Sequence, residues 1–152
     1  MTNYGIRPSA IVIHNNKVLV VRSKYGNKEF YLFPGGGLER FETIAGGAKR
    51  ETLEETGYDI EIDRLVYVNE YIDPKNPENR SIGMFFLAKL KSLQPINKPI
   101  TDEGKIKEVL WIDLDKIKEI DLRPRIIRDN LEEDYKRNFG NAIRYSVDYK
   151  KE

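Results

Sequence analysis

The chain contains no cysteine, and this absence excludes several classes of protein at once. Without cysteine there is no disulfide scaffold, no zinc site with thiolate ligands and no thiol nucleophile. Histidine is nearly absent as well. The single one, His14, stands beside Asn15-Asn16, and we interpret it as a surface or turn residue rather than a catalytic base.

An excess of charge of one sign is also missing. Lysine and arginine number 26 against 25 aspartate and glutamate, so bulk electrostatics give no case for a nucleic-acid or membrane partner. No apolar run approaches the length of a membrane span, and the start, MTNYGIRPSA, lacks the apolar core of a signal peptide. We therefore expect a cytoplasmic protein, with one domain spanning residues 1–152.

The residues most informative about chemistry lie in the segment 36–58, GGLERFETIAGGAKRETLEETGY. Glu51, Glu54 and Glu55 stand at positions i, i+3 and i+4, so a helix places them on one face, where like charges repel. Mg²⁺ would reverse that balance, because it binds a few carboxylates and completes its shell with waters and substrate phosphates. The spacing predicts a metal site for a phosphate-bearing ligand. The alternative is an ordinary solvated face of a helix.

This helix has recognisable ends in the sequence. Thr43 can act as N-cap, and Gly57 stands where a left-handed residue would end the helix. Small side chains at Ala45, Ala48 and Thr52 form a separate stripe, which would let the helix lie close against a sheet. Before the helix, the run Pro34-Gly35-Gly36-Gly37 lets the backbone approach a metal or a phosphate closely.

The remaining elements alternate between strands and helices. Asn15-Asn16 suits a tight type I′ hairpin turn, and the continuous apolar run 18–21 indicates a strand buried on both faces. We expect a short helix at 115–120, a second helix from Pro124 to near Asn138, and a polar tail at 145–152. Expected strands cover residues 10–14, 17–22, 30–33, 60–71, 81–90 and 109–112. This order predicts an α/β or α+β sandwich.

The segment 36–58 resembles the Nudix box. With Gly36 as its first position, every glycine and charged position of that signature is filled, through Glu42, Arg50-Glu51, Glu54-Glu55 and Gly57. Thr52 and Tyr58 depart from hydrophobic positions of the signature, and Arg40-Phe41 stands where many members carry a glycine before the glutamate. The resemblance implies the Nudix fold, a mixed β-sheet flanked by helices.

The family also implies a role for each residue of the box. Glu51, Glu54 and Glu55, with a backbone carbonyl at Gly35, would bind Mg²⁺ or Mn²⁺. Arg50 would pair with Glu42 and orient the carboxylates. Glu39 is expected near the metal-binding loop. Water would then attack one phosphorus of a diphosphate joined to another group, without a covalent intermediate.

The general base stays open between three glutamates. Glu51 could act through a bound water, while Glu103 stands on a loop where the family often supplies a further carboxylate. Glu108, closer to the following strand, is the second choice on that loop. For each of the two loop residues taken alone, an ordinary surface glutamate is the slightly favoured interpretation.

We expect a metal-dependent hydrolase of a nucleoside diphosphate linked to another moiety, of the ADP-ribose or nucleotide-sugar type. Two alternatives are a nucleoside triphosphate pyrophosphohydrolase and a non-catalytic sensor that binds a nucleotide. The sensor usually accompanies loss of box carboxylates, and this chain keeps them all. The expected partner is a small nucleotide-type molecule, and since many family members are dimers, a homodimer is an open alternative.

Overall fold

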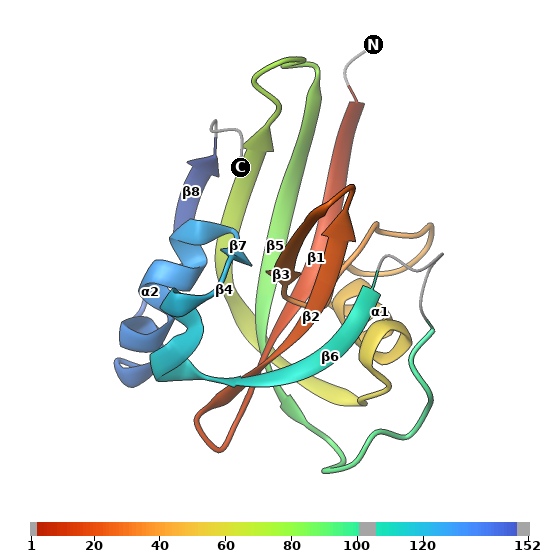
Figure 1. Ribbon diagram of the computed structural model, residues 1–152, viewed down its shortest axis with the longest axis vertical. Helices are drawn as coiled ribbons and strands as arrows, with labels where there is room; N and C mark the ends of the chain where they lie inside the picture. The colour runs from red at the N-terminus through yellow and green to blue at the C-terminus, as the bar shows by residue number, and fades with distance from the viewer. Residues whose placement is uncertain (1–2, 101–105, 149–152) are drawn as a thin grey trace.

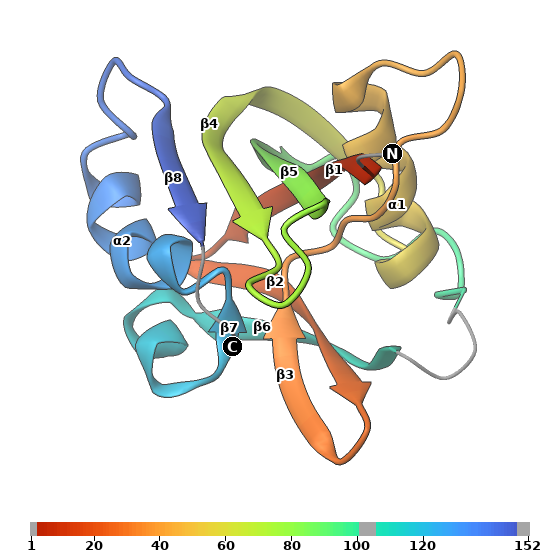
Figure 2. The ribbon, with the colours of Figure 1, turned by 90° about the horizontal axis from the view of Figure 1, so that it is seen from above.

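The computed structural model describes residues 3–100 and 106–148 of the chain. A mixed sheet curls through the molecule, with helices α1 and α2 on opposite sides of it (Figures 1 and 2). In chain order the elements are β1 (Asn3–His14), β2 (Lys17–Tyr25), β3 (Lys28–Leu32), α1 (Ile44–Thr56), β4 (Ile60–Ile72), β5 (Asn79–Leu90), β6 (Ile106–Asp113), the 3₁₀ helix η1 (Leu114–Glu119), β7 (Leu122–Arg123), α2 (Arg125–Lys136) and β8 (Arg144–Asp148). The predicted fold class is confirmed.

The sheet consists of two halves joined by one hairpin. Its strand order is β7-β3-β2-β1-β5-β4-β8. The strand β6 lies outside this linear order and pairs antiparallel with β2. Strand β1 pairs β2 only at Ile13–Val18 and His14–Lys17, next to the turn. Beyond these pairs the strands part, and β1 instead forms a long parallel ladder with β5. The turn itself is as predicted, because Asn15 and Asn16 have φ of 49° and 61°.

Two apolar clusters fill the two faces of the sheet, and β1 contributes to both. Ile11 and Ile13 pack into the cluster that contains Ile127 and Leu131 of α2. Ala10 and Val12 belong to the second cluster, which also contains Leu19 and Ile60. Alternate residues of a strand point to opposite faces, so a strand between two cores has no polar side. This explains the continuous apolar run of β2.

The helix α1 begins and ends as its sequence predicts. Thr43 Oγ1 accepts a hydrogen bond from the Gly46 backbone N–H at 2.9 Å, and Gly57 ends the helix with φ of 80°. The helix lies directly on β1. A Cβ at Gly47 would lie 2.7 Å from Cγ of Pro8, so this glycine permits the close contact between helix and sheet.

Two expectations about strands need correction. The predicted strand 10–14 begins seven residues earlier, because its first part pairs with β5 rather than forming a local hairpin. The predicted polar tail 145–152 is wrong for its described part, since β8 pairs in parallel with β4. Long-range contacts secure β8, among them the hydrogen bond from Ser146 Oγ to Asn69 Oδ1 of β4 at 2.7 Å. A strand held by distant partners has little local signal.

Smaller differences concern the C-terminal helices. The short helix expected at 115–120 is the 3₁₀ helix η1, and α2 ends two residues before Asn138 with Pro124 as its N-cap. Among the described residues, no helix has both the length and the apolar character needed to cross a membrane.

Candidate active site

The glycine run lies against the edge of β1, in the space that opens where β2 leaves it. The Ala10 N–H donates to the carbonyl of Pro34 at 2.9 Å, and the Gly36 N–H donates to the carbonyl of Pro8 at 3.2 Å. Ser9 and Gly35 form a single β-bridge. A Cβ at Gly35 would lie 2.0 Å from Ser9 Oγ, so no side chain fits there. The turn is thereby fixed to the sheet.

Gly36 brings the same turn into contact with α1. A Cβ on this glycine would lie 2.4 to 2.5 Å from the carboxylate atoms of Glu51. Any larger residue would therefore displace that carboxylate. The sequence predicts close backbone approach at the glycines, and the structure shows that the group approached is a side chain of α1.

Arg50 is the centre of the charged network. Its Nε and Nη2 donate to the two carboxylate oxygens of Glu42 at 3.0 and 2.8 Å, a bidentate arrangement that fixes the guanidinium plane. This hydrogen bonding from Arg50, with a second bond from the Glu39 N–H, lowers the pKa of Glu42 to about 2. Nη2 also donates to the carbonyl of Gly37 at 3.0 Å. Arg50 thus links the loop before α1 to the helix itself.

The remaining nitrogen of Arg50 contacts the helix carboxylates. Nη1 donates to Glu51 Oε1 at 2.8 Å and to Glu54 Oε2 at 3.2 Å. The sequence argument treats these glutamates as mutually repelling charges, whereas the structure places a cation between them. That cation comes from the preceding residue of the helix, so periodicity alone does not reveal it.

Glu55 lies deeper than its two neighbours. One oxygen accepts a hydrogen bond from the Gly35 N–H at 2.7 Å. Burial raises the pKa of Glu55 to about 7, reinforced by the negative charges of Glu51 and Glu54 and opposed by the Gly35 N–H and by Arg7. A buried carboxyl beside two other carboxylates is a place where a cation would be stabilised.

The donor set fits a hard divalent cation. Within the described residues, no three carboxylate or imidazole groups already converge as a bound ion requires. Instead, Arg50 Nη1 engages one oxygen each of Glu51 and Glu54, and the Gly35 N–H engages one oxygen of Glu55. Carboxylate and carbonyl oxygens are the ligands that Mg²⁺ and Mn²⁺ prefer. A cation in place of the Arg50 Nη1 would meet Glu51 and Glu54 and would favour the charged form of the buried Glu55.

Of the two loop candidates for the general base, only Glu108 is among the described residues. Glu103 falls outside the described residues. Glu108 lies on β6, 49% exposed, with its carboxylate 3.2 Å from Nε of Arg22 on the neighbouring strand. Glu39 is an exposed residue beside the site, with a carboxylate oxygen 3.5 Å from Nε of Arg50. Of the two candidates for this role among the described residues, Glu51 contacts the glycine turn and Glu108 contacts Arg22.

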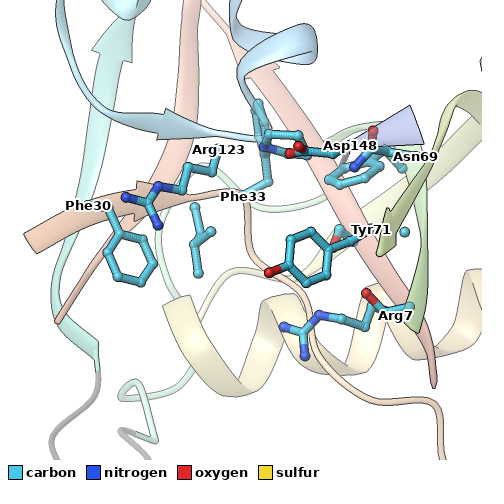
Figure 3. Close-up of a pocket in the computed structure, with 13 residues that line it drawn as sticks. Arg7, Phe30, Phe33, Asn69, Tyr71, Arg123 and Asp148 are labelled. Atoms are coloured by element: carbon cyan, nitrogen blue, oxygen red, sulfur yellow. The ribbon is translucent and has the colours of Figure 1, made fainter. Parts of the chain in front are cut away.

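A cavity of about 340 Å³ opens beside the glycine turn (Figure 3). Ser9, which bridges Gly35, forms part of its wall, and Arg7 lies at the same end. The polar residues around it are not predicted from the sequence. Their positions are scattered over β1, β4, β5 and β8, and no local spacing connects them. Among the lining residues are Arg7, Ser9, Asn69, Tyr71, Ser81 and Asp148.

The family model of the NUDIX domain matches residues 5–131. The chain belongs to the Nudix family. The resemblance predicted from residues 36–58 is therefore confirmed, and in the Nudix fold this box comprises the glycine turn and α1. The strand β8 lies beyond the matched region.

Known Nudix proteins resemble the chain over much of its length. A mouse protein named nucleoside diphosphate-linked moiety X motif 6 is 31% identical over 117 residues, covering 74% of this chain and 35% of the mouse protein. The 8-oxo-dGTP diphosphatase of Buchnera aphidicola is 36% identical over 81 residues, covering 53% of this chain and 60% of that protein. The chain thus spans less than two thirds of either relative. A solved NUDIX hydrolase from Nitrosomonas europaea is 29% identical, with a TM-score of 0.75, covering 99% of this chain and 81% of that one.

Proposed function

We propose that residues 1–152 form one Nudix domain that hydrolyses a diphosphate bond in a nucleoside diphosphate linked to another moiety. The observation that carries this proposal is the arrangement of three α1 carboxylates, organised by Arg50 and Gly35, beside a cavity large enough for a small nucleotide. The nearly neutral overall charge agrees with a small-molecule substrate.

In this proposal Glu51, Glu54, Glu55 and the carbonyl of Gly35 would hold Mg²⁺ or Mn²⁺. Such an ion polarises phosphoryl oxygens and makes a bound water more acidic. Arg50, fixed by its two bonds to Glu42, orients the carboxylates and keeps them from spreading apart in the metal-free protein. Removal of such supporting contacts typically costs ten- to a hundred-fold in metal affinity or activity.

We assign the general base to Glu51 first, because it contacts the glycine turn, with Glu103 and Glu108 as alternatives. Glu51→Gln should then abolish turnover even when the metal is saturating. Turnover that survives this change would remove Glu51 from the role and leave it to one of the two loop glutamates.

Two other functions share the same site. Hydrolysis of nucleoside triphosphates is supported by the name of the Buchnera relative, 8-oxo-dGTP diphosphatase. A non-catalytic nucleotide sensor would use the cavity alone. The sensor has less support, because the chain keeps every charged residue of the Nudix box.

The deciding experiment is product release from a panel of nucleoside diphosphate conjugates, including ADP-ribose and nucleotide sugars, and of nucleoside triphosphates, with Mg²⁺ and with chelator. Glu54→Gln removes one proposed ligand charge while keeping its shape. Glu61→Gln is the matched control, since Glu61 is exposed on β4 and pairs only loosely with Lys89 at 3.8 Å.

Turnover on one class of compound, lost with chelator and in Glu54→Gln but kept in Glu61→Gln, would support the proposal and identify the class. Binding without turnover in every protein would favour the sensor instead.

A further inference from the structure

Two of the three proposed metal ligands stand in the last turn of α1. The helix ends at Thr56, and Glu54 and Glu55 directly precede this residue. The last carbonyls of a helix have no partner inside it, so this turn opens more readily than the rest of the helix unless other groups bind those carbonyls. Carboxylates in such a turn keep a fixed geometry only if the turn itself is secured.

A distant segment of the chain supplies a donor to this turn. After β5 the chain returns and runs beside α1 (Figures 1 and 2). We call residues 95–100 of this connection the strap. At its end, the Ile100 N–H donates to the carbonyl of Glu54 at 2.6 Å. The carbonyl that the strap binds thus belongs to a proposed metal ligand.

Gly57 is the second point of attachment. The N–H groups of Ile96 and Asn97 both donate to its carbonyl, at 2.8 and 3.3 Å. The approach is close, because a Cβ at Gly57 would lie 2.1 Å from the carbonyl oxygen of Asn97. Gly57 therefore has two effects: its φ of 80° ends the helix, and its missing side chain leaves room for the strap.

The strap is attached by its backbone while its side chains stay in solvent. Every residue of the strap is exposed, and the apolar side chains of Ile96 and Ile100 are 54% and 68% exposed. Pro95 and Pro99 each stand directly before a donor residue. Proline has a fixed φ and no N–H, so both prolines restrict the strap without removing a donor. Because exposed side chains add little to the core, the main consequence of these bonds is a secured helix end.

We propose that the strap is a positioning element for the metal site, acting through the Ile100 N–H. While the strap is attached, its bond fixes the Glu54 carbonyl, and Arg50 Nη1 holds the carboxylate of the same residue at 3.2 Å. When the strap detaches, the last turn can open, and a cation must order it again on binding, so affinity falls. The inference rests on the proposed function, from which it takes Glu54 and Glu55 as metal ligands.

Substitutions at Ile100 separate the backbone donor from the side chain. Ile100→Pro removes the N–H, whereas Ile100→Ala keeps it and shortens a mostly exposed side chain. In calorimetric titration with Mg²⁺ alone, Ile100→Pro should bind about five-fold more weakly than wild type, as expected for one lost hydrogen bond. Ile100→Ala should bind as wild type does. Leu93→Pro is the matched control, because Leu93 is 67% exposed on the same connection and its N–H makes no hydrogen bond within the part of the chain that the structure describes.

A strap that only stabilises the fold would give a different result. Ile100→Pro would then lower the free energy of unfolding and leave the Mg²⁺ affinity unchanged. For a positioning element, initial rates on a compound that the wild-type protein hydrolyses should show a half-saturating Mg²⁺ concentration raised about five-fold. The rate at saturating Mg²⁺ should return close to the wild-type value, because the bound cation orders the turn.

Hydrogen exchange tests the same coupling in the wild-type protein without a substitution. Coupling between two sites is reciprocal, so saturating Mg²⁺ should slow exchange of the Ile100 amide about five-fold, measured by NMR. The Asn76 amide is the control, because it donates to the carbonyl of Asp73 in the loop between β4 and β5. Its exchange should not change.

An unchanged Mg²⁺ affinity in Ile100→Pro, a comparable loss in Ile100→Ala or Leu93→Pro, or an Ile100 amide insensitive to Mg²⁺ would each overturn the inference and leave the hydrolase proposal standing. If melting temperatures show that Ile100→Pro does not fold, the exchange measurement decides. The expected affinities and exchange rates without turnover on any compound of the panel would support the strap and refute the hydrolase. A wild-type protein that binds no Mg²⁺ would overturn both.

Discussion

Replacing Glu55 with glutamine should stabilise the metal-free protein above neutral pH. Glu55 has a pKa raised to about 7 from a usual value of 4.5, chiefly by burial. In the folded state this group therefore holds its proton to higher pH than in the unfolded chain. Stability from this group is fully present below pH 4.5 and is lost as the pH rises through 7.

The size of the effect follows from the pKa difference. A shift of one pKa unit corresponds to about 1.4 kcal/mol, so the raised pKa of Glu55 predicts a loss of about 3 kcal/mol between pH 4.5 and pH 8. For a protein of this length the same change lowers the melting temperature by about 6 to 12 °C. Glutamine has no charge to bury, and its side-chain oxygen still accepts the hydrogen bond of the Gly35 N–H.

The assay is denaturant unfolding in chelator at several pH values from 5 to 8. The wild-type free energy of unfolding should fall across this range, while that of Glu55→Gln should stay nearly level. Carboxyls with lowered pKa, such as Glu42 and Asp134, contribute stability that is lost only as the pH falls below their usual pKa, so they do not disturb this window. Added Mg²⁺ should restore wild-type stability at pH 8 by binding the folded state, and should have a much smaller effect on the variant.

Glu54→Gln is the control, because the Glu54 side chain is 42% exposed and its charge is not buried. Two outcomes would refute a cost of burying the charged form of Glu55. One is equal wild-type stability in chelator at pH 5 and pH 8, and the other is a Glu55→Gln variant that is no more stable than wild type at pH 8.

Three further substitutions test other features of the site and the fold. Gly36→Ala should lower metal affinity and turnover at least ten-fold, because its Cβ would displace the Glu51 carboxylate. Metal titration and initial rates measure these effects, and unchanged kinetics would contradict the close approach of Gly36 to Glu51. Phe41→Gly should stabilise the protein by about 1 kcal/mol in denaturant unfolding, since this fully exposed residue has φ of 64°. A loss of stability would show that the backbone of Phe41 is not strained. Tyr67→Phe should cost about 2 kcal/mol in the same assay, because its hydroxyl donates to buried Asp134 at 2.7 Å; no change would show that the bond contributes nothing net.

The features that the sequence predicts well are those set by local chemistry. The ends of α1 depend on Thr43 and Gly57, whose caps involve residues within four positions. The turn at Asn15-Asn16 requires only that both residues adopt positive φ. The Nudix box is readable for the same reason, because a helix converts fixed spacing into a shared face.

The features that the sequence misses depend on contacts between distant segments. Asp148 and Asn69 are far apart in the chain, and only the parallel pairing of β4 and β8 brings them together. Arg7 lies in a part of β1 whose strand character comes from its partner β5. The direct hydrogen bonds from Arg50 to Glu51 and Glu54 do not follow from spacing alone either, because side-chain direction on a helix decides them; the resemblance to the Nudix box implies only that Arg50 orients the carboxylates.

The glycine turn and the terminal strand β8 belong to the same half of the sheet, with β5 and β4 between β1 and β8. The turn and helix proposed to act on the phosphates rest on one edge and one face of β1, near the middle of the domain. The strand β8 stands at the margin of this half, and its only strand partner among the described residues is β4. A substitution in β8 that keeps its ladder with β4 therefore changes the cavity wall without touching the glycine turn or α1.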